Sequence, residues 1–112
     1  MFWTIQNQFL NLAFIWWYSD YYKQALADTL GPFDFLFVHN VKEERPRISP
    51  KEIIELHQMI KPKKKTIVTL VELNLTKATF ISDFMEECQN LNISSDNFIF
   101  LRLDETVNLL EN

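Results

Sequence analysis

The sequence predicts a small, three-layer α/β domain with a short, mainly parallel sheet, and three observations point to it. Runs of apolar and β-branched residues indicate three strands, at about 33–38, 66–72 and 97–103. Two segments with helical spacing separate these strands, and an uncharged aromatic segment precedes them. Strands that alternate with helices of roughly ten to fifteen residues are typical of right-handed crossovers in a parallel sheet. A chain of 112 residues suffices for one such domain.

The N-terminal segment, residues 1–30, is expected to be one long amphipathic helix over about 3–29. No charged residue precedes Asp20, and Gly31-Pro32 would end the helix. Apolar residues recur at helical spacing and form an unusually wide face. The face could pack on the core or a protein partner, on a second copy of the chain, or on a membrane surface. Its candidate interaction residues are Trp3, Phe9, Trp16, Trp17 and Tyr21.

Residues 31–112 are expected to form a βαβαβ core with a short C-terminal helix. The run Phe33–Val38 is nearly all apolar, as in a strand buried on both faces. Ser49 suits a helix N-cap, Pro50 the first helical position, and Glu52 completes a capping box. Pro62 would stop that helix before the second strand.

The second crossover helix is expected over about 77–91. It would place Phe80, Ile81, Phe84, Cys88 and Leu91 on one face. A turn at 94–96 leads into the third strand, and Asp104 is in a position to cap a last helix through Leu110.

Several classes of function are excluded or disfavoured by composition. Gly31 is the only glycine, so the glycine-rich loops that cradle nucleotide phosphates cannot form in their usual shape. A net charge of −4 argues against general nucleic-acid affinity. Cys88 is the only cysteine, which rules out an internal disulfide and a cysteine-based zinc site. We therefore predict no cofactor, and the absence of a signal peptide favours an intracellular protein, cytoplasmic before nuclear.

Part of the chain resembles a known family. The stretch 33–37, then 59–62 leading into 67–71, is similar to the second half of the class I methyltransferase fold, which is Rossmann-like. The stretches 55–57, 67–72 and 80–84 are also similar to plant GRAS regulators, which share that fold without needing its chemistry. Lys63-Lys64 stand where that family has glycines, and its glycine-rich first strand is absent. The resemblance therefore implies the topology of residues 33–103 rather than methyl transfer.

The carboxyl ends of the three strands are the second candidate site. Ligands of parallel sheets bind beyond those ends, where a histidine and carboxylates could do acid–base work or hold a metal. Polar residues are expected at strand ends in any case, because these ends border solvent. The residues that would gather there are His39, Asn40, Glu72, Asn74 and Asp104.

Three further features have structural interpretations. We expect His57 to be a boundary residue of its helix and Cys88 to be a buried, inert thiol. The basic cluster Lys61, Lys63, Lys64 and Lys65 could bind phosphates or act as a nuclear-localisation signal. It could equally be a solvated loop that protects the following strand from aggregation.

These observations favour a non-enzymatic protein-interaction module that uses the aromatic N-terminal helix or an open sheet edge. Such a module would be an assembly subunit, an immunity protein or an inhibitor, with a protein partner or a second copy bound to it. A Rossmann-like enzyme or enzyme fragment with a site at the strand ends is the first alternative. Peripheral membrane association through the N-terminal helix is the second.

Overall fold

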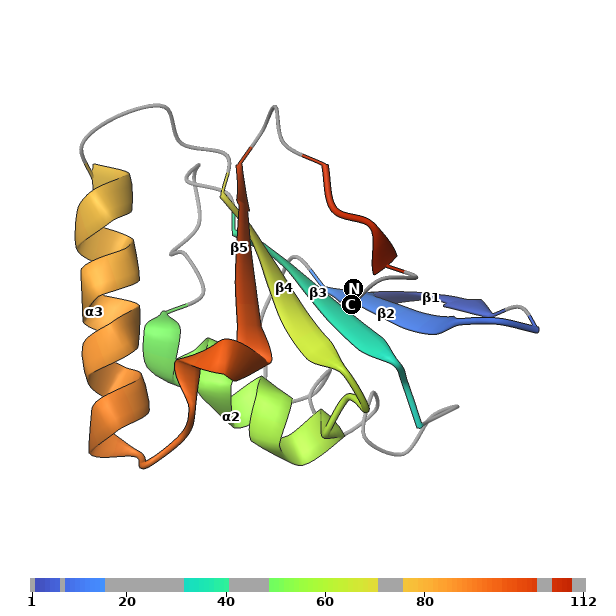
Figure 1. The fold of residues 1–112 in the computed structure, drawn as a ribbon, viewed down its shortest axis with the longest axis horizontal. Coiled ribbons are helices and arrows are strands. Elements are labelled where there is room, and N and C mark those ends of the chain that lie inside the picture. The colour runs from blue at the N-terminus through green and yellow to red at the C-terminus, as the bar shows by residue number, and fades with distance from the viewer. Residues whose placement is uncertain are drawn as a thin grey trace.

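The structure is a computed structural model that describes residues 2–6, 8–15, 32–40, 49–70, 76–102 and 106–109 (Figure 1). It confirms the predicted α/β class. Its elements in chain order are β1 (Phe2–Gln6), β2 (Asn11–Ile15), β3 (Phe35–Asn40), α2 (Pro50–Ile60), β4 (Lys65–Leu70), α3 (Thr76–Asn90), the 3-10 turn η1 (Ser95–Asn97) and β5 (Phe98–Arg102).

The described strands form one five-stranded mixed sheet in the order β1-β2-β3-β4-β5. Strands β2 to β5 are parallel to one another, and β1 pairs antiparallel with β2. The three predicted strands correspond to β3, β4 and β5. The strand order follows the chain order, so these strands contain no reversal of order of the kind that opens a ligand crevice in doubly wound sheets.

The predicted helix over 3–29 is wrong for its first half, because residues 2–6 and 11–15 are strands, and its residues 16–29 lie outside the described residues. Both faces of β2 are covered: Ala13 and Ile15 are buried on one face, while Leu12 and Phe14 are half-buried on the other. Such a strand is apolar at nearly every position, so its sequence also fits a helical stripe. The connection at 7–10 contains neither glycine nor proline to mark a turn.

Helices α2 and α3 lie on the same side of the sheet (Figure 1). They bury their apolar faces against each other and against alternate residues of the strands. The predicted stripe of α3 is confirmed, except that Leu91 follows the last helical residue and is exposed. The hydrophobic core comprises Ala13, Ile15, Phe33, Leu36, Val38, Ile53, Ile54, Leu56, Val68, Phe80, Phe84, Cys88 and Phe98.

Helix α2 begins as the sequence predicts. The Ser49 side chain accepts a hydrogen bond from the backbone N–H of Glu52, and the Glu52 carboxylate accepts one from the backbone N–H of Ser49. The helix ends at Lys61, which is left-handed at φ 50° and donates its N–H to the carbonyl of His57. Asn92 has the same left-handed φ, at 56°, just after α3. Both helices therefore end without the glycine that this conformation favours.

The opposite side of the sheet has no helix among the described residues. The C-terminal segment 106–109 lies on this side in Figure 1. The sequence predicts a last helix from about Asp104 to Leu110, of which the structure describes residues 106–109. Residues 106–108 are not helical, and residues 104, 105 and 110 lie outside the described residues. The predicted three-layer arrangement depends on the N-terminal helix as the third layer. The described elements form two layers, the sheet and the pair of helices α2 and α3. Neither α2 nor α3 has the length and apolar character needed to cross a membrane.

Candidate functional site

Strand β1 is the outermost described strand of the sheet, at the end farthest from α3 (Figure 1). Its sequence, Phe-Trp-Thr-Ile-Gln, contains no charge and no proline. The side chain of Ile5 is 49% exposed, and Phe9, in the connection to β2, is 72% exposed. Natural edge strands are usually protected by charge, proline or a bulge, because their unpaired N–H and C=O groups can pair with another chain. Neither a charge nor a proline protects β1.

The predicted interaction residues do not lie together on one helix face in the structure. Trp3 belongs to β1, and Phe9 lies in the connection that follows it. Trp16, Trp17 and Tyr21 lie outside the described residues. Residues 2–6 and 11–15 are strands, so they cannot belong to a membrane-binding helix over 3–29, and membrane association through the remaining residues stays a prediction.

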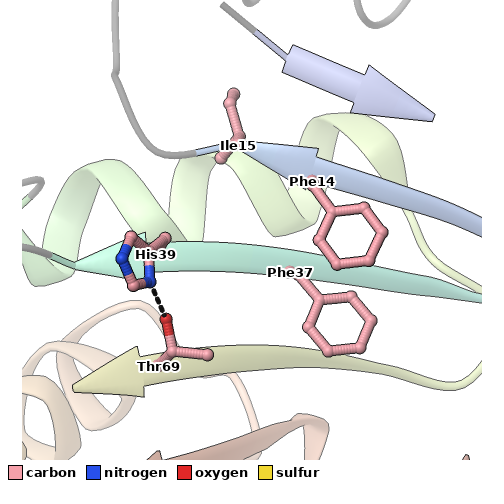
Figure 2. Close-up of a pocket in the computed structure, with 5 residues that line it drawn as sticks. All are labelled: Phe14, Ile15, Phe37, His39 and Thr69. Atoms are coloured by element: carbon pink, nitrogen blue, oxygen red, sulfur yellow. Dashed lines mark hydrogen bonds between the residues drawn. The ribbon is translucent and has the colours of Figure 1, made fainter. Parts of the chain in front are cut away.

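A cavity of about 220 Å³ lies near the carboxyl ends of three parallel strands, on the sheet face opposite the helices. Phe14 and Ile15 come from β2, Phe37 and His39 from β3, and Thr69 from β4. Figure 2 shows the two phenylalanine rings side by side and the histidine nearer the strand ends. The rings of Phe14 and Phe37 are stacked, with centroids 4.6 Å apart and planes 15° apart.

His39 and Thr69 supply the polar side chains of this cavity. The Nδ1 atom of His39 and the Oγ1 atom of Thr69 are 2.6 Å apart and share a hydrogen bond (Figure 2). The Thr69 hydroxyl also donates to the carbonyl of Val38 at 3.5 Å. Burial lowers the pKa of His39, so its imidazole is neutral at pH 7. A neutral imidazole keeps one nitrogen as a hydrogen-bond acceptor.

The structure describes only part of the predicted strand-end pocket. His39 lines the cavity, and Asn40 is the last residue of β3. Glu72, Asn74 and Asp104 lie outside the described residues. Sequence reasoning missed Phe14, Phe37 and Thr69. Phe37 is two residues from His39 on β3, so the alternation of side chains along a strand could have placed it on the same face. Thr69 lies directly opposite His39 in the pairing of β3 with β4, which the sequence alone does not specify.

His57 lies on the helix-covered side of the sheet. Its Nδ1 atom is 2.7 Å from Oγ1 of the buried Thr66, and its ring centroid lies 4.7 Å from that of Phe98. Burial lowers the pKa of His57. The half-buried side chain fits the predicted boundary position.

Cys88 is buried in the core on α3, as expected. Burial and the neighbouring Glu87 carboxylate raise the pKa of its thiol, which keeps it protonated and unreactive at neutral pH.

The lysine cluster surrounds the start of β4, at the opposite end of the strand from the cavity. The backbone N–H groups of Lys63 and Lys64 donate to the carbonyls of Phe33 and Asp34. The Lys64 ammonium lies 5.8 Å from the ring centroid of the buried Phe35. This arrangement supports the interpretation of a protective loop, because the lysine stems and charges cover an apolar strand entrance. Phosphate binding by the cluster stays a prediction.

The described residues contain no group of three or more histidine, cysteine, aspartate or glutamate side chains that could hold a metal ion. No protein-family model, curated protein or solved structure matches this chain. The resemblance to methyltransferases therefore stays a prediction, and function is argued from the geometry of the β1 edge and of the strand-end cavity.

Proposed function

We propose that the chain is a protein-interaction module that pairs with a second copy of itself through strand β1. One observation supports this proposal above the others: β1 forms one end of the described sheet and contains neither a charge nor a proline. Addition of a strand at such an edge satisfies backbone groups on both chains at once.

A second copy is the occupant that the strand itself fits. Two-fold symmetry is the commonest symmetry of homodimers, and two identical edge strands related by a two-fold axis pair antiparallel. Full overlap of Phe2–Gln6 with its symmetry mate sets Thr4 opposite Thr4 and Ile5 opposite Trp3. Threonine pairs and pairs of aromatic with β-branched residues are favourable across antiparallel strands. No like charges oppose each other in this register or in any shifted one, because the strand has no charged residue.

Exposed apolar side chains near the same edge add to the interaction. Ile5 and Phe9 are two of the large hydrophobic residues that the described surface exposes most. Pairing through β1 would bury part of this surface together with the strand edge. Backbone hydrogen bonds would then join the two strands, and apolar burial would supply most of the affinity.

The test is the solution mass of the purified chain, measured by light scattering coupled to size-exclusion chromatography. We expect twice the 13.4 kDa mass of one chain. Ile5→Lys should weaken the dimer roughly tenfold or more, because a two-fold axis applies the substitution twice. Thr4→Lys, which sets two ammonium groups opposite each other, should act in the same direction.

Met85→Lys is the matched control. Met85 is 36% exposed on α3, and the substitution adds the same charge far from β1 in the chain. This variant should keep the dimer mass. A monomer at all concentrations from about 10 µM to 1 mM would contradict the proposal, since even small interfaces associate in that range. Equal dissociation of the Ile5 and Met85 variants would also contradict it, because the interface would then not involve β1.

A further inference from the structure

The strand-end cavity has the composition of a small-ligand site. Apolar atoms of Phe14, Ile15 and Phe37 form most of its walls, and His39 and Thr69 add a hydrogen-bonded polar pair. Binding sites for small molecules combine these two elements: apolar walls supply affinity, and a few placed polar groups set orientation. Four of the five side chains are half-buried, so they lie within reach of a ligand from solvent.

The volume limits the size of the ligand. A dry protein cavity of about 150 Å³ lined by apolar side chains binds benzene. A cavity of about 220 Å³ therefore accepts one aromatic ring with a substituent, or two fused rings. Larger cofactors such as dinucleotides would extend out of it into solvent. The stacked rings of Phe14 and Phe37 present aromatic surface on which a planar ligand can pack.

The hydrogen bonds around Thr69 determine which polar group the ligand should carry. A threonine hydroxyl has one proton, and here it is directed to the carbonyl of Val38. In the tautomer that agrees with this bond, His39 Nδ1 carries the proton of its hydrogen bond to Thr69, and Nε2 keeps its lone pair. Among the described residues Nε2 has no partner. A ligand with an N–H or O–H group would supply one.

From these contacts we infer that the cavity binds a small, uncharged aromatic molecule with one hydrogen-bond donor, oriented by His39. The inference does not depend on the proposed dimer, because the cavity is lined by β2, β3 and β4 and not by β1.

The test is calorimetric titration of the full chain with indole, and with benzofuran, which has the same shape but no donor. We expect indole to bind with a dissociation constant below about 1 mM, within the range of affinities that so few atoms can supply. Benzofuran should bind roughly fivefold more weakly or worse, the effect of one lost hydrogen bond. His39→Phe should remove this preference for indole while leaving an aromatic ring at the site.

His57→Phe is the matched control, since it makes the same change to a histidine paired with a threonine on the other sheet face. It should leave indole binding unchanged. Phe14→Trp, which adds volume at the cavity wall, should weaken both ligands. Absence of saturable indole binding to the unmodified chain would overturn the inference. So would equal losses in the His39 and His57 variants, because the ligand would then bind elsewhere or respond to stability alone. The mass of each variant, measured in parallel, separates these results from the fate of the dimer.

Discussion

Replacement of Phe84 by alanine tests whether α3 packs on the sheet as described. Phe84 is fully buried on α3, and its ring meets those of Phe98 and Phe100 edge-on, with centroids 4.8 and 5.0 Å away. The ring of Phe80 lies 6.2 Å away on the same helix. Phe84 therefore links the helix layer to β5, and its removal leaves a cavity among three aromatic rings.

The expected loss is large compared with the stability of such a domain. Truncation of a buried phenylalanine to alanine costs about 3–5 kcal/mol. A chain of this length is stable by about 6–17 kcal/mol, taking the usual range per residue. With an unfolding entropy of about 2.1 cal/mol/K per residue, the loss lowers the melting temperature by about 13–21 °C. Phe84→Leu, which keeps most of the volume but loses the edge-on contacts, should cost about 1–1.5 kcal/mol.

Urea and thermal unfolding followed by circular dichroism measure these values. Met85→Ala is the control, because Met85 is the next residue of α3 and is partly exposed. It should change the free energy of unfolding by less than about 0.5 kcal/mol. Similar small losses in the alanine variants at 84 and 85, under about 1 kcal/mol, would refute the packing of α3 through Phe84.

Two further predictions concern pH and helix capping. Burial lowers the pKa of both His39 and His57 below the ordinary 6.5, so the unfolded chain binds more protons than the folded chain at mildly acidic pH. The stability from the neutral rings is present above about pH 6.5 and should fall on acidification through that pH, by at most about 1.4 kcal/mol per pH unit for each histidine. Unfolding measured from pH 7.5 to 5 should show a smaller slope in the His57→Phe variant, and an unchanged slope would contradict the prediction. Ser49→Ala, which removes the capping box of α2, should cost about 1 kcal/mol in urea unfolding. Ser82→Ala on the exposed face of α3 should be neutral or slightly stabilising, and equal losses would argue against the cap.

The helices and strands from α2 to β5 could be predicted because capping residues, apolar spacing and strand-bounding residues all indicate the same secondary structure there. At the start of α2, Ser49, Pro50 and Glu52 each favour a helix start, and the apolar spacing that follows agrees with them. Lysines mark the start of β4, and a turn that contains Ser94 and Ser95 precedes β5. Local preference and burial pattern coincide in this part of the chain.

The hairpin could not be predicted because its burial removes the alternation that marks a strand. Ala13 faces the helices, while Phe14 packs on Phe37 on the other side. Apolar residues on both faces of β2 produce a continuous run with no period of two. The side chains of the cavity were missed for a related reason: Thr69 gains its role only through pairing of β4 with His39 on β3. Such a contact depends on strand register, which local sequence does not contain.

The identity of strand order and chain order affects how the protein can fold during its synthesis. Each described strand after β1 emerges from the ribosome when the strand beside which it will lie already exists. None of these described strands has to insert between two earlier ones. The β1–β2 hairpin can form first, within about 1–10 µs of emerging. Each later edge then waits for the next strand while the intervening residues are translated, at about 5–20 residues per second. During those seconds the growing edge moves from β3 to β4 and finally to β5, whereas β1 stays at the opposite end throughout. A nascent chain could therefore pair with a neighbouring nascent chain through β1 before its own sheet is complete.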